Sequence, residues 1–393
     1  MFGFTKPSNP GLRTLFLLFF IAQSAINLGN YTSLIYSAVA FSELSKPAFL
    51  ILFQTIGSLG AFLLLNSAGT AAVKRISFTK LLLLNSAAAF LSSNVGGYYL
   101  WICFVMIRIV FATILISKLQ AHLALVTKDR EETQYYSKFM QSLYLFTFLV
   151  ALTLSPLAQQ AIGPSKVYLM DAGLMLLMLL IARATGFHKA SDEGAVESPA
   201  AGLPRLSMKE ALVFAPYIVW MWLVAGSFHV IEVPYLTNLV KLSSGQLTLV
   251  FLTAGIGAVL GSLFVPIQLI SKHKQKTTFY AAAAISAFSL IYLKTVLLPG
   301  ILLIVLFYGV SNGCFNVGVS NMIYDKIATD KHTAAFAFYR LLSNFSVIAA
   351  AIVMSSIGDI RHAFGGQVFL TILGTGIYLC LTMLQKKTGW SAE

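Results

Sequence analysis

Apolar residues run along most of the chain in long blocks, separated by short polar stretches. Each block is about 20 residues or longer, the length that a helix needs to cross the ~30 Å hydrocarbon core of a bilayer. The blocks therefore predict twelve membrane-spanning helices in two sets of six. The first set covers residues 13–40, 47–68, 78–95, 98–126, 134–160 and 165–186; the second covers 209–237, 245–271, 277–297, 299–324, 332–356 and 363–385.

A polar stretch with Gly, Pro and Ser lies between the two sets. This composition is typical of a flexible surface linker. We expect an N-terminal six-helix bundle over residues 1–187, a linker over 188–208 and a C-terminal six-helix bundle over 209–393. The expected fold class is an all-α integral membrane protein built from two pseudo-symmetric bundles.

Composition supports a bilayer as the solvent, because 58% of the 393 residues are hydrophobic and only 10% are charged. Soluble domains carry about 25% charged residues. The net charge of +13 would suggest nucleic acid in a soluble protein, but here the positive charges fit a topology signal. With a cytoplasmic N-terminus, 20 of the 27 Lys and Arg residues fall on the cytoplasmic side and 5 on the other side. The positive-inside rule then predicts two cytoplasmic termini in a bacterial inner membrane, and no nucleic-acid partner.

Motifs for catalysis and cofactor binding are missing from the sequence. It holds no G-x-x-x-x-G-K-[ST] loop and no HExxH. Cys103, Cys314 and Cys380 lie in apolar runs without metal-ligand spacing. We therefore expect neither an enzyme nor a cofactor or metal site.

Two six-helix halves joined by a cytoplasmic linker resemble the major facilitator superfamily over nearly the whole chain. That family carries Gly-x-x-x-Asp-Arg/Lys-x-Gly-Arg/Lys between its second and third helices. Here the loop reads "GTAAVKRISFTK", in which Gly69 and Lys74 match, while Val73 replaces the Asp and Ile76 the second Gly. In the second half, "GSLFVPIQLISKHKQK" keeps Gly261 and a basic cluster.

Two further segments resemble exporters of this superfamily. The stretch "ALTLSPLAQQ" keeps Pro156 of the antiporter motif in the fifth helix, with Gln159 and Gln160 in place of glycines. The run "AQQAIGPSKVYLMDAGLML" is similar to the branch that includes enterobactin and macrolide efflux proteins. The resemblance implies a transporter that alternates access between its halves, with export favoured.

Arg108 and Lys118 are the cations of the fourth helix. Charge at membrane depth is costly and rarely persists without a partner, a cavity or a function. Arg108 lies near mid-membrane, where it either binds substrate and biases a nearby acid or forms a structural pair. Lys118 either reaches the cavity or extends to the cytoplasmic surface. Asp171 is expected to cap the sixth helix, since an acid in the first turn complements the helix dipole.

The segment "GSFHVIEVPYLTN" places His229 and Glu232 on one helical face ahead of Pro234, which is expected to bend the helix. Burial favours a neutral carboxyl group and a nearby cation favours a charged one. Glu232 is therefore the best candidate to carry a coupling proton, with His229 and Arg108 as partners. Its position in the outer third of the helix fits an extracellular gate equally well, and a static salt bridge is the structural alternative.

Amide side chains form two polar stripes. Gln23, Asn27 and Asn30 follow helical spacing beside Tyr31, and Asn312 and Asn316 repeat the pattern in the tenth helix. In the superfamily the first, fourth, seventh and tenth helices line the cavity, so the resemblance implies two facing stripes. Interhelical hydrogen bonding is the structural alternative. The remaining substrate-contact candidates are Tyr144, Trp220, Arg340 and Asn344.

The cavity is expected to hold more base than acid, because Arg108, Arg340 and Lys118 oppose only Glu232. We therefore expect a monomeric, proton-coupled transporter of a small anionic or carboxylate-rich molecule, such as a natural product, siderophore or drug. Uptake of an anionic metabolite or metal–siderophore chelate is the alternative within this class. A receptor that binds without transport is the alternative outside it.

Overall fold

The computed structural model describes residues 9–40, 47–66, 76–94, 98–188, 206–357 and 362–387. Side chains at 31–40, 47–55 and some other positions inside these helices lie outside the description. Predicted features at Gly69, Val73 and Lys74, and most of the expected linker over 188–208, are also outside it. The two ends of the chain, on which the predicted location of the termini depends, are not described either.

The described residues before the linker, called here the N-terminal half, form long helices. These are α1 (Pro10–Ala40), α2 (Pro47–Asn66), α4 (Phe78–Asn94), α5 (Tyr98–Val126), α6 (Arg130–Ile162) and α7 (Pro164–Ala184). Gly163 separates α6 from α7 with a φ of 83°, a left-handed conformation that glycine adopts without a Cβ clash. Pro164 then opens α7, where its fixed φ suits the first helical turn.

The described residues after the linker, called the C-terminal half, begin with the short α9 (Met208–Ala211). The long helices are α10 (Ala215–Pro234), α11 (Ser244–Phe264), α12 (Ile267–Tyr292), α13 (Leu298–Lys326), α14 (His332–Ile357) and α15 (Ala363–Lys387). A π-helical turn, η1 (Tyr235–Leu239), continues α10 beyond Pro234, and the 3₁₀ turn η2 (Thr329–Lys331) precedes α14. Capping boxes start α9 at Ser207 and α11 at Ser243.

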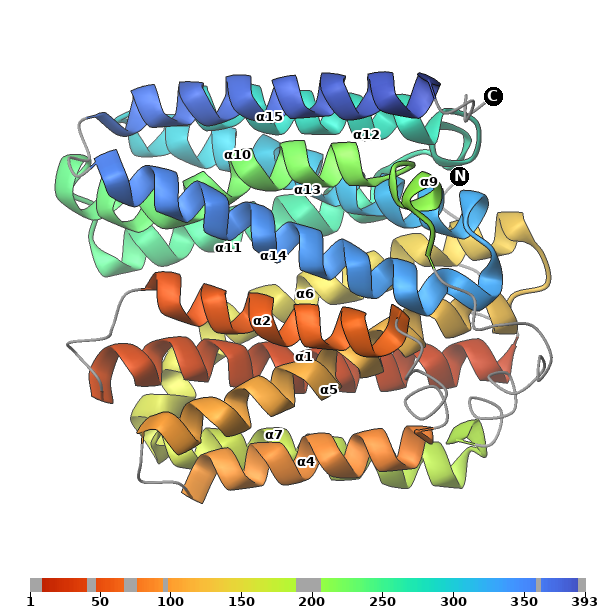
Figure 1. Cartoon of the computed structure of the whole chain (residues 1–393). Helices are drawn as coiled ribbons and strands as arrows, with labels where there is room; N and C mark the ends of the chain where they lie inside the picture. Colours follow the sequence, from red (N-terminus) through yellow and green to blue (C-terminus); the bar gives the residue numbers. More distant parts are fainter. Residues whose placement is uncertain are drawn as a thin grey trace.

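The helices lie side by side along a common direction, with the two halves of the chain in adjacent layers (Figure 1). Within the N-terminal half, α1 packs on α5, α6 and α7, and α4 packs on α5 and α7. Within the C-terminal half, α10 packs on α12, α14 and α15, and α13 packs on α11 and α12. The halves meet where α2 and α5 contact α14 and where α6 contacts α11 and α13.

One end of the bundle, called here the linker end, collects the first turn of α1, the end of α5 and the start of α6. Asn9 donates to the Val126 carbonyl at 2.8 Å, and the Arg130 guanidinium lies 3.1 Å from the Asp325 carboxylate at the end of α13. The helix α9 lies at this end as well, because Lys331 of η2 pairs with Glu210 at 2.7 Å. Burial disfavours the Glu210 carboxylate, but bonds from Lys331 and Ser207 outweigh it and lower its pKa.

Two predicted boundaries in the C-terminal half are wrong. The helix expected over 245–271 ends at Phe264, because Pro266 breaks it, and α12 begins at Ile267. The basic stretch expected as a loop is therefore helical, with a kink at His273. The helix expected over 209–237 is divided into α9, α10 and η1.

Helices occur in all the apolar ranges that the sequence predicts, so the all-helical class is confirmed. Among the described residues, 7 helices are long and apolar enough to cross a membrane. The chain is accordingly a multi-pass membrane protein. The count of twelve crossings, the pseudo-symmetry and the division at 188–208 stay predictions.

Close packing of α11 on α13 depends on four glycines, of which only Gly261 was singled out in the sequence, as part of a loop motif. Gly257 and Gly261 lie one turn apart on α11, and Gly309 and Gly313 repeat the spacing on α13. A Cβ at Gly261 would overlap the Val310 carbonyl, and one at Gly313 would overlap the backbone of α11. Small residues at this spacing let membrane helices approach closely, so the four glycines set the distance between α11 and α13.

Replacing Gly261 by valine should separate α11 from α13. We expect Gly261→Val to lower the free energy of unfolding by about 1–3 kcal/mol, the usual cost of overpacking. Thermal unfolding of the detergent-purified protein measures the change. Gly376→Val is the matched control, because a Cβ at Gly376 meets nothing within 4 Å. Equal shifts in the two variants would contradict this role for Gly261.

Candidate functional site

A fully buried ion pair occupies the interior of the N-terminal half. The Arg108 Nε on α5 donates to the Asp171 Oδ2 on α7 at 2.5 Å, and both side chains have 0% exposure. Arg108 also donates to Asn30 Oδ1 at 3.0 Å and to the Ile26 carbonyl of α1 at 3.0 Å. A single guanidinium thus connects α1, α5 and α7. Its geometry matches the structural pair that the sequence left open, and a substrate role for Arg108 stays a prediction.

Gly29 provides the space for this pair. A Cβ at that position would overlap the Arg108 Nη2 and approach the Asp171 Oδ2. The backbone of α1 can therefore come close enough for its carbonyls to accept from the guanidinium. Asn30, predicted to face substrate, is oriented towards Arg108 instead in this structure.

The expected capping role of Asp171 is wrong. The helix α7 begins at Pro164 and has no acid in its first turn, so Asp171 lies about two turns inside it. Its carboxylate meets a buried cation instead of the free amides of a helix end. The helix predicted over 165–186 starts six residues before Asp171, so the error lies in assigning this acid to the first turn and not in the extent of the helix.

Arg340 is held very differently from Arg108. It lies on α14, where the Nη2 group donates to Gln120 Oε1 of α5 across a long 3.4 Å contact between the two halves. Its Nε is buried without a hydrogen-bond partner. Within the described part of the chain, no ion pair joins Arg340 to an acid. Arg340 is partly buried, and a cation with little water around it and no described counter-charge favours an anion beside it.

Hydrogen-bonding groups gather beside Arg340. The neighbouring Tyr339 donates to Asn316 Oδ1 at 2.6 Å, and Asn316 donates to Asn312 Oδ1 at 2.7 Å. Tyr144 of α6 is close enough to interact electrostatically with Arg340 and Tyr339. The structure therefore brings together four predicted residues, Arg340, Tyr144, Asn312 and Asn316, from helices of both halves.

Glu232 is the buried acid of the C-terminal half, with 5% exposure. It accepts a hydrogen bond from Tyr292 at 3.3 Å, and Tyr292 packs against Phe228. Among the described residues no cation pairs with Glu232. A lone carboxylate ion is costly in such surroundings. The His229 side chain lies outside the described residues.

Other predicted residues contact neighbours within their own half. Gln23 is buried, and Asn27 donates to Thr147 at 3.2 Å. Lys118 donates to the Ile76 carbonyl at 2.9 Å, and Trp220 packs between Phe279 and Tyr378.

Asn344 differs from these residues because it reaches the other half, where it donates to Ser58 of α2 at 2.8 Å. The Tyr31 side chain is not described. These contacts are all within the protein, so the substrate contacts expected of the predicted residues stay predictions.

A seam of small polar residues joins α6 to α11 and α13 towards the linker end. This contact was not predicted from the sequence. The bonds run between Ser142 and Ser262 (2.7 Å), Gln141 and Ser320 (2.6 Å), Ser137 and Asn321 (3.0 Å), and Lys138 and the Val265 carbonyl (2.7 Å). Arg130 and Asp325 close the seam at the surface. The signal in the sequence that could have predicted this seam is the series of polar residues along otherwise apolar helices.

Metal-binding chemistry finds little support in the part of the chain that the structure describes. There, no group of three or more His, Cys, Asp or Glu side chains is arranged to hold an ion. The cysteines are free thiols on separate helices.

Solved structures with similar folds are membrane transporters. The human organic anion transporter MFSD10 (TETRAN) aligns with a TM-score of 0.68 and 13% identity, over 97% of this chain and 100% of that one. A bacterial homologue of the iron transporter ferroportin, in its outward-facing state, aligns with a TM-score of 0.69 and 12% identity, over 95% and 99% of the chains. The same homologue with soaked iron gives 0.68 and 12% over 94% and 99%.

The sequence matches no family model and no curated protein. At this level of identity, the alignments establish the fold. The chain has the fold of these transporters across nearly its full length.

Neutralising Asp171 should leave Arg108 buried without a counter-charge. We expect Asp171→Asn to lower the free energy of unfolding by about 3–5 kcal/mol, and Arg108→Met with Asp171→Leu to recover most of that loss. Thermal unfolding in detergent measures both, with the exposed Asp330→Asn as control. A double variant no more stable than Asp171→Asn would refute the pairing.

Proposed function

We propose that the chain is a secondary active transporter of the major facilitator superfamily that moves a small anionic molecule across a membrane. Arg340 carries the proposal, because its partly buried guanidinium lies between the halves with one long hydrogen bond and no acid among the described residues. The hydroxyl and amide groups of Tyr144, Tyr339 and Asn316 would orient a carboxylate or phosphate against it. The fold is shared with an organic anion transporter and with a homologue of an iron transporter, so the anionic substrate class rests on Arg340.

Alternating access is the proposed mechanism. The two bundles, residues 1–187 and 209–393, would rock about a substrate held between them. The polar seam of α6 with α11 and α13 would then be the contact that opens when the site faces the linker end. The hydrogen bonds of the seam are short but few. Once the seam opens, water can replace them as the hydrogen-bond partner of these side chains.

Protons are the proposed coupling ion and Glu232 the proposed carrier. A carboxyl group buried beside Tyr292 without a cation would hold a proton in one state and release it when water reaches it in another. We propose export from a bacterial cytoplasm through the inner membrane by a monomer, on the resemblance of the fifth helix to exporters. Uptake of an anionic metabolite or chelate would use the same site with the gradient reversed.

Removing the Arg340 charge should abolish anion recognition. A hydrogen bond to a charged group contributes roughly 1.5–3 kcal/mol, so we expect Arg340→Gln to weaken anion binding about 10- to 100-fold. A thermal-shift screen of aromatic carboxylates, their amides and matched amines first finds a ligand, and flux into proteoliposomes then tests transport. Arg340→Lys should keep part of the activity, and the exposed Arg183→Gln should keep all of it. Anion flux unchanged in Arg340→Gln would refute the proposal.

Glu232→Gln separates coupling from substrate binding. We expect the variant to exchange labelled for unlabelled substrate across the liposome membrane while losing accumulation driven by a pH gradient. Glu131→Gln, an exposed acid in the first turn of α6, is the control. Gradient-driven accumulation that survives in Glu232→Gln would assign the proton to another group.

A disulfide across the seam should stop the cycle. The Ser142 and Ser262 hydroxyl oxygens lie 2.7 Å apart, which is compatible with a disulfide between cysteines at these positions. In a background without Cys103, Cys314 and Cys380, we expect oxidised Ser142→Cys/Ser262→Cys protein to lose transport and a reductant to restore it. Each single variant should be indifferent to oxidation. Full transport by the cross-linked protein would show that the seam need not open.

A further inference from the structure

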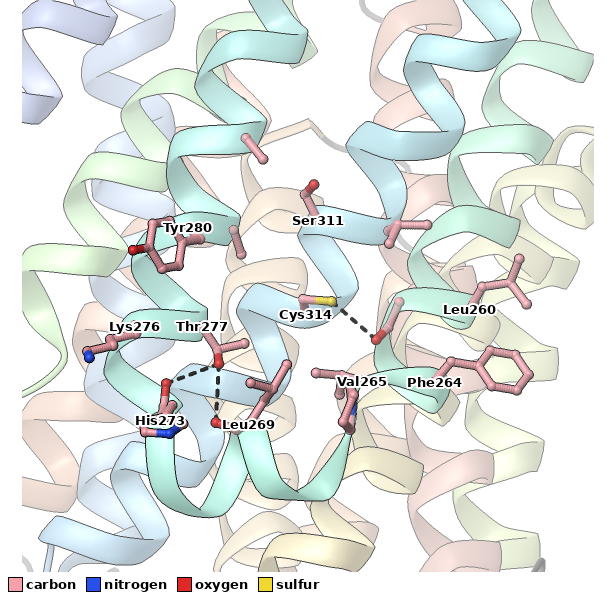
Figure 2. Close-up of a pocket in the computed structure, with 15 residues that line it drawn as sticks. Leu260, Phe264, Val265, Leu269, His273, Lys276, Thr277, Tyr280, Ser311 and Cys314 are labelled. Atoms are coloured by element: carbon pink, nitrogen blue, oxygen red, sulfur yellow. Dashed lines mark hydrogen bonds between the residues drawn. The ribbon is translucent and has the colours of Figure 1, made fainter. Parts of the chain in front are cut away.

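A groove on the outer face of the C-terminal half has a different chemistry from the candidate site around Arg340. It has a volume of about 680 Å³ and lies between α11, α12 and α13. Figure 2 shows Leu260 and Phe264 on one wall, Tyr280 and Thr277 on the other, and Cys314 and Ser311 on the floor. Its surface is almost wholly apolar except at one end.

The groove follows from the packing of its three helices. The glycines hold α13 tightly against α11, while the break at Pro266 directs α12 away from α11. Gly261 has no side chain and Ala281 and Ala284 have only methyl groups, so the space between the three helices is left unfilled. Thr277 donates to the Leu269 and His273 carbonyls and so stabilises the kinked first turns of α12.

Basic residues mark one end of the groove. Lys276 and His273 belong to its lining and are exposed. Lys272 directly precedes His273 on α12, and none of the lining residues is acidic. Lys274 points elsewhere, since it pairs with Asp325 at 2.7 Å. This end therefore offers positive charge without a built-in counter-ion.

The length of the groove matches one leaflet of a bilayer. At about 1.5 Å per residue, the path along α12 from His273 to Ala284 is about 16 Å, close to half of the ~30 Å hydrocarbon core. The basic end then lies at the level of the lipid headgroups. The apolar walls extend from there towards the bilayer centre, and exposed apolar side chains such as Phe264 and Leu260 line the opening.

We propose that this groove binds an anionic phospholipid, with an acyl chain between α11 and α12 and the headgroup phosphate at Lys276 and His273. Headgroup charge distinguishes the candidate lipids. A zwitterionic lipid would contact the apolar walls equally well, but its headgroup would be attracted less strongly to the basic end. The lipid site requires only that the protein is embedded in a membrane, so this proposal does not rest on the proposed transport function. A bound lipid would also brace α12 next to the seam, because Val265, beside the break, accepts from Lys138 of α6.

Native mass spectrometry of the full-length protein tests the site. The probes are dioleoylphosphatidylglycerol and dioleoylphosphatidylcholine, which share their acyl chains and differ in headgroup charge. We expect the wild type to retain the anionic lipid about fivefold better, the effect of roughly one Lys at an anionic surface. Lys276→Gln should abolish the preference, while Lys276→Arg should keep it. Lys80→Gln, an exposed lysine of the N-terminal half, should not alter it.

A second variant tests the apolar walls. Ala284→Phe fills the groove without changing charge, so it should reduce retention of both lipids, and a monodisperse elution profile shows that it folds. Equal retention of the two lipids by the wild type, or a loss in Lys80→Gln as large as in Lys276→Gln, would overturn the proposal. Displacement of the anionic lipid by equimolar inorganic phosphate would overturn it as well, because the groove would then recognise a free anion.

Discussion

The ion pair between Arg108 and Asp171 is the interaction on which the N-terminal half depends. A charge at bilayer depth is costly unless an opposite charge and hydrogen bonds replace its water. Here one carboxylate from α7, and one amide and two carbonyls from α1, surround the guanidinium of α5. Gly29 is part of the same solution, because any side chain there would displace the pair. The positions of α1, α5 and α7 are therefore coupled through one charged group.

Two charged groups of the C-terminal half lack the partners that neutralise Arg108. Arg340 is partly buried without a described counter-charge, and Glu232 is buried without a described cation, on different helices of the C-terminal half. Such groups destabilise an empty protein unless something else supplies the missing charge. A substrate anion at Arg340 and a proton at Glu232 would each do so. The contrast with the neutralised Arg108 is what makes these two groups functional candidates.

The helices were predictable because apolar blocks of bilayer length leave few alternatives in so hydrophobic a chain. Partners were not predictable: nothing in the sequence indicates that Asp171 lies opposite Arg108 rather than at a helix end. The break at Pro266 and the glycine contacts of α11 with α13 were missed for a related reason. Both depend on how close two helices approach, which is a property of the assembled bundle. The resemblance placed Asn312 and Asn316 at the cavity with the tenth helix, but it did not place the helices of Tyr144 and Arg340 there.

The selectivity of Arg340 for charge is the most direct test of this account. The measurement compares the affinity of the purified protein for one aromatic carboxylate with its affinity for the corresponding amide, in wild type and in Arg340→Gln. The account predicts a carboxylate preference of about tenfold or more in the wild type, and none in the variant, because a charge-assisted bond is lost. An equal preference in both proteins would contradict it and would place the anion site elsewhere.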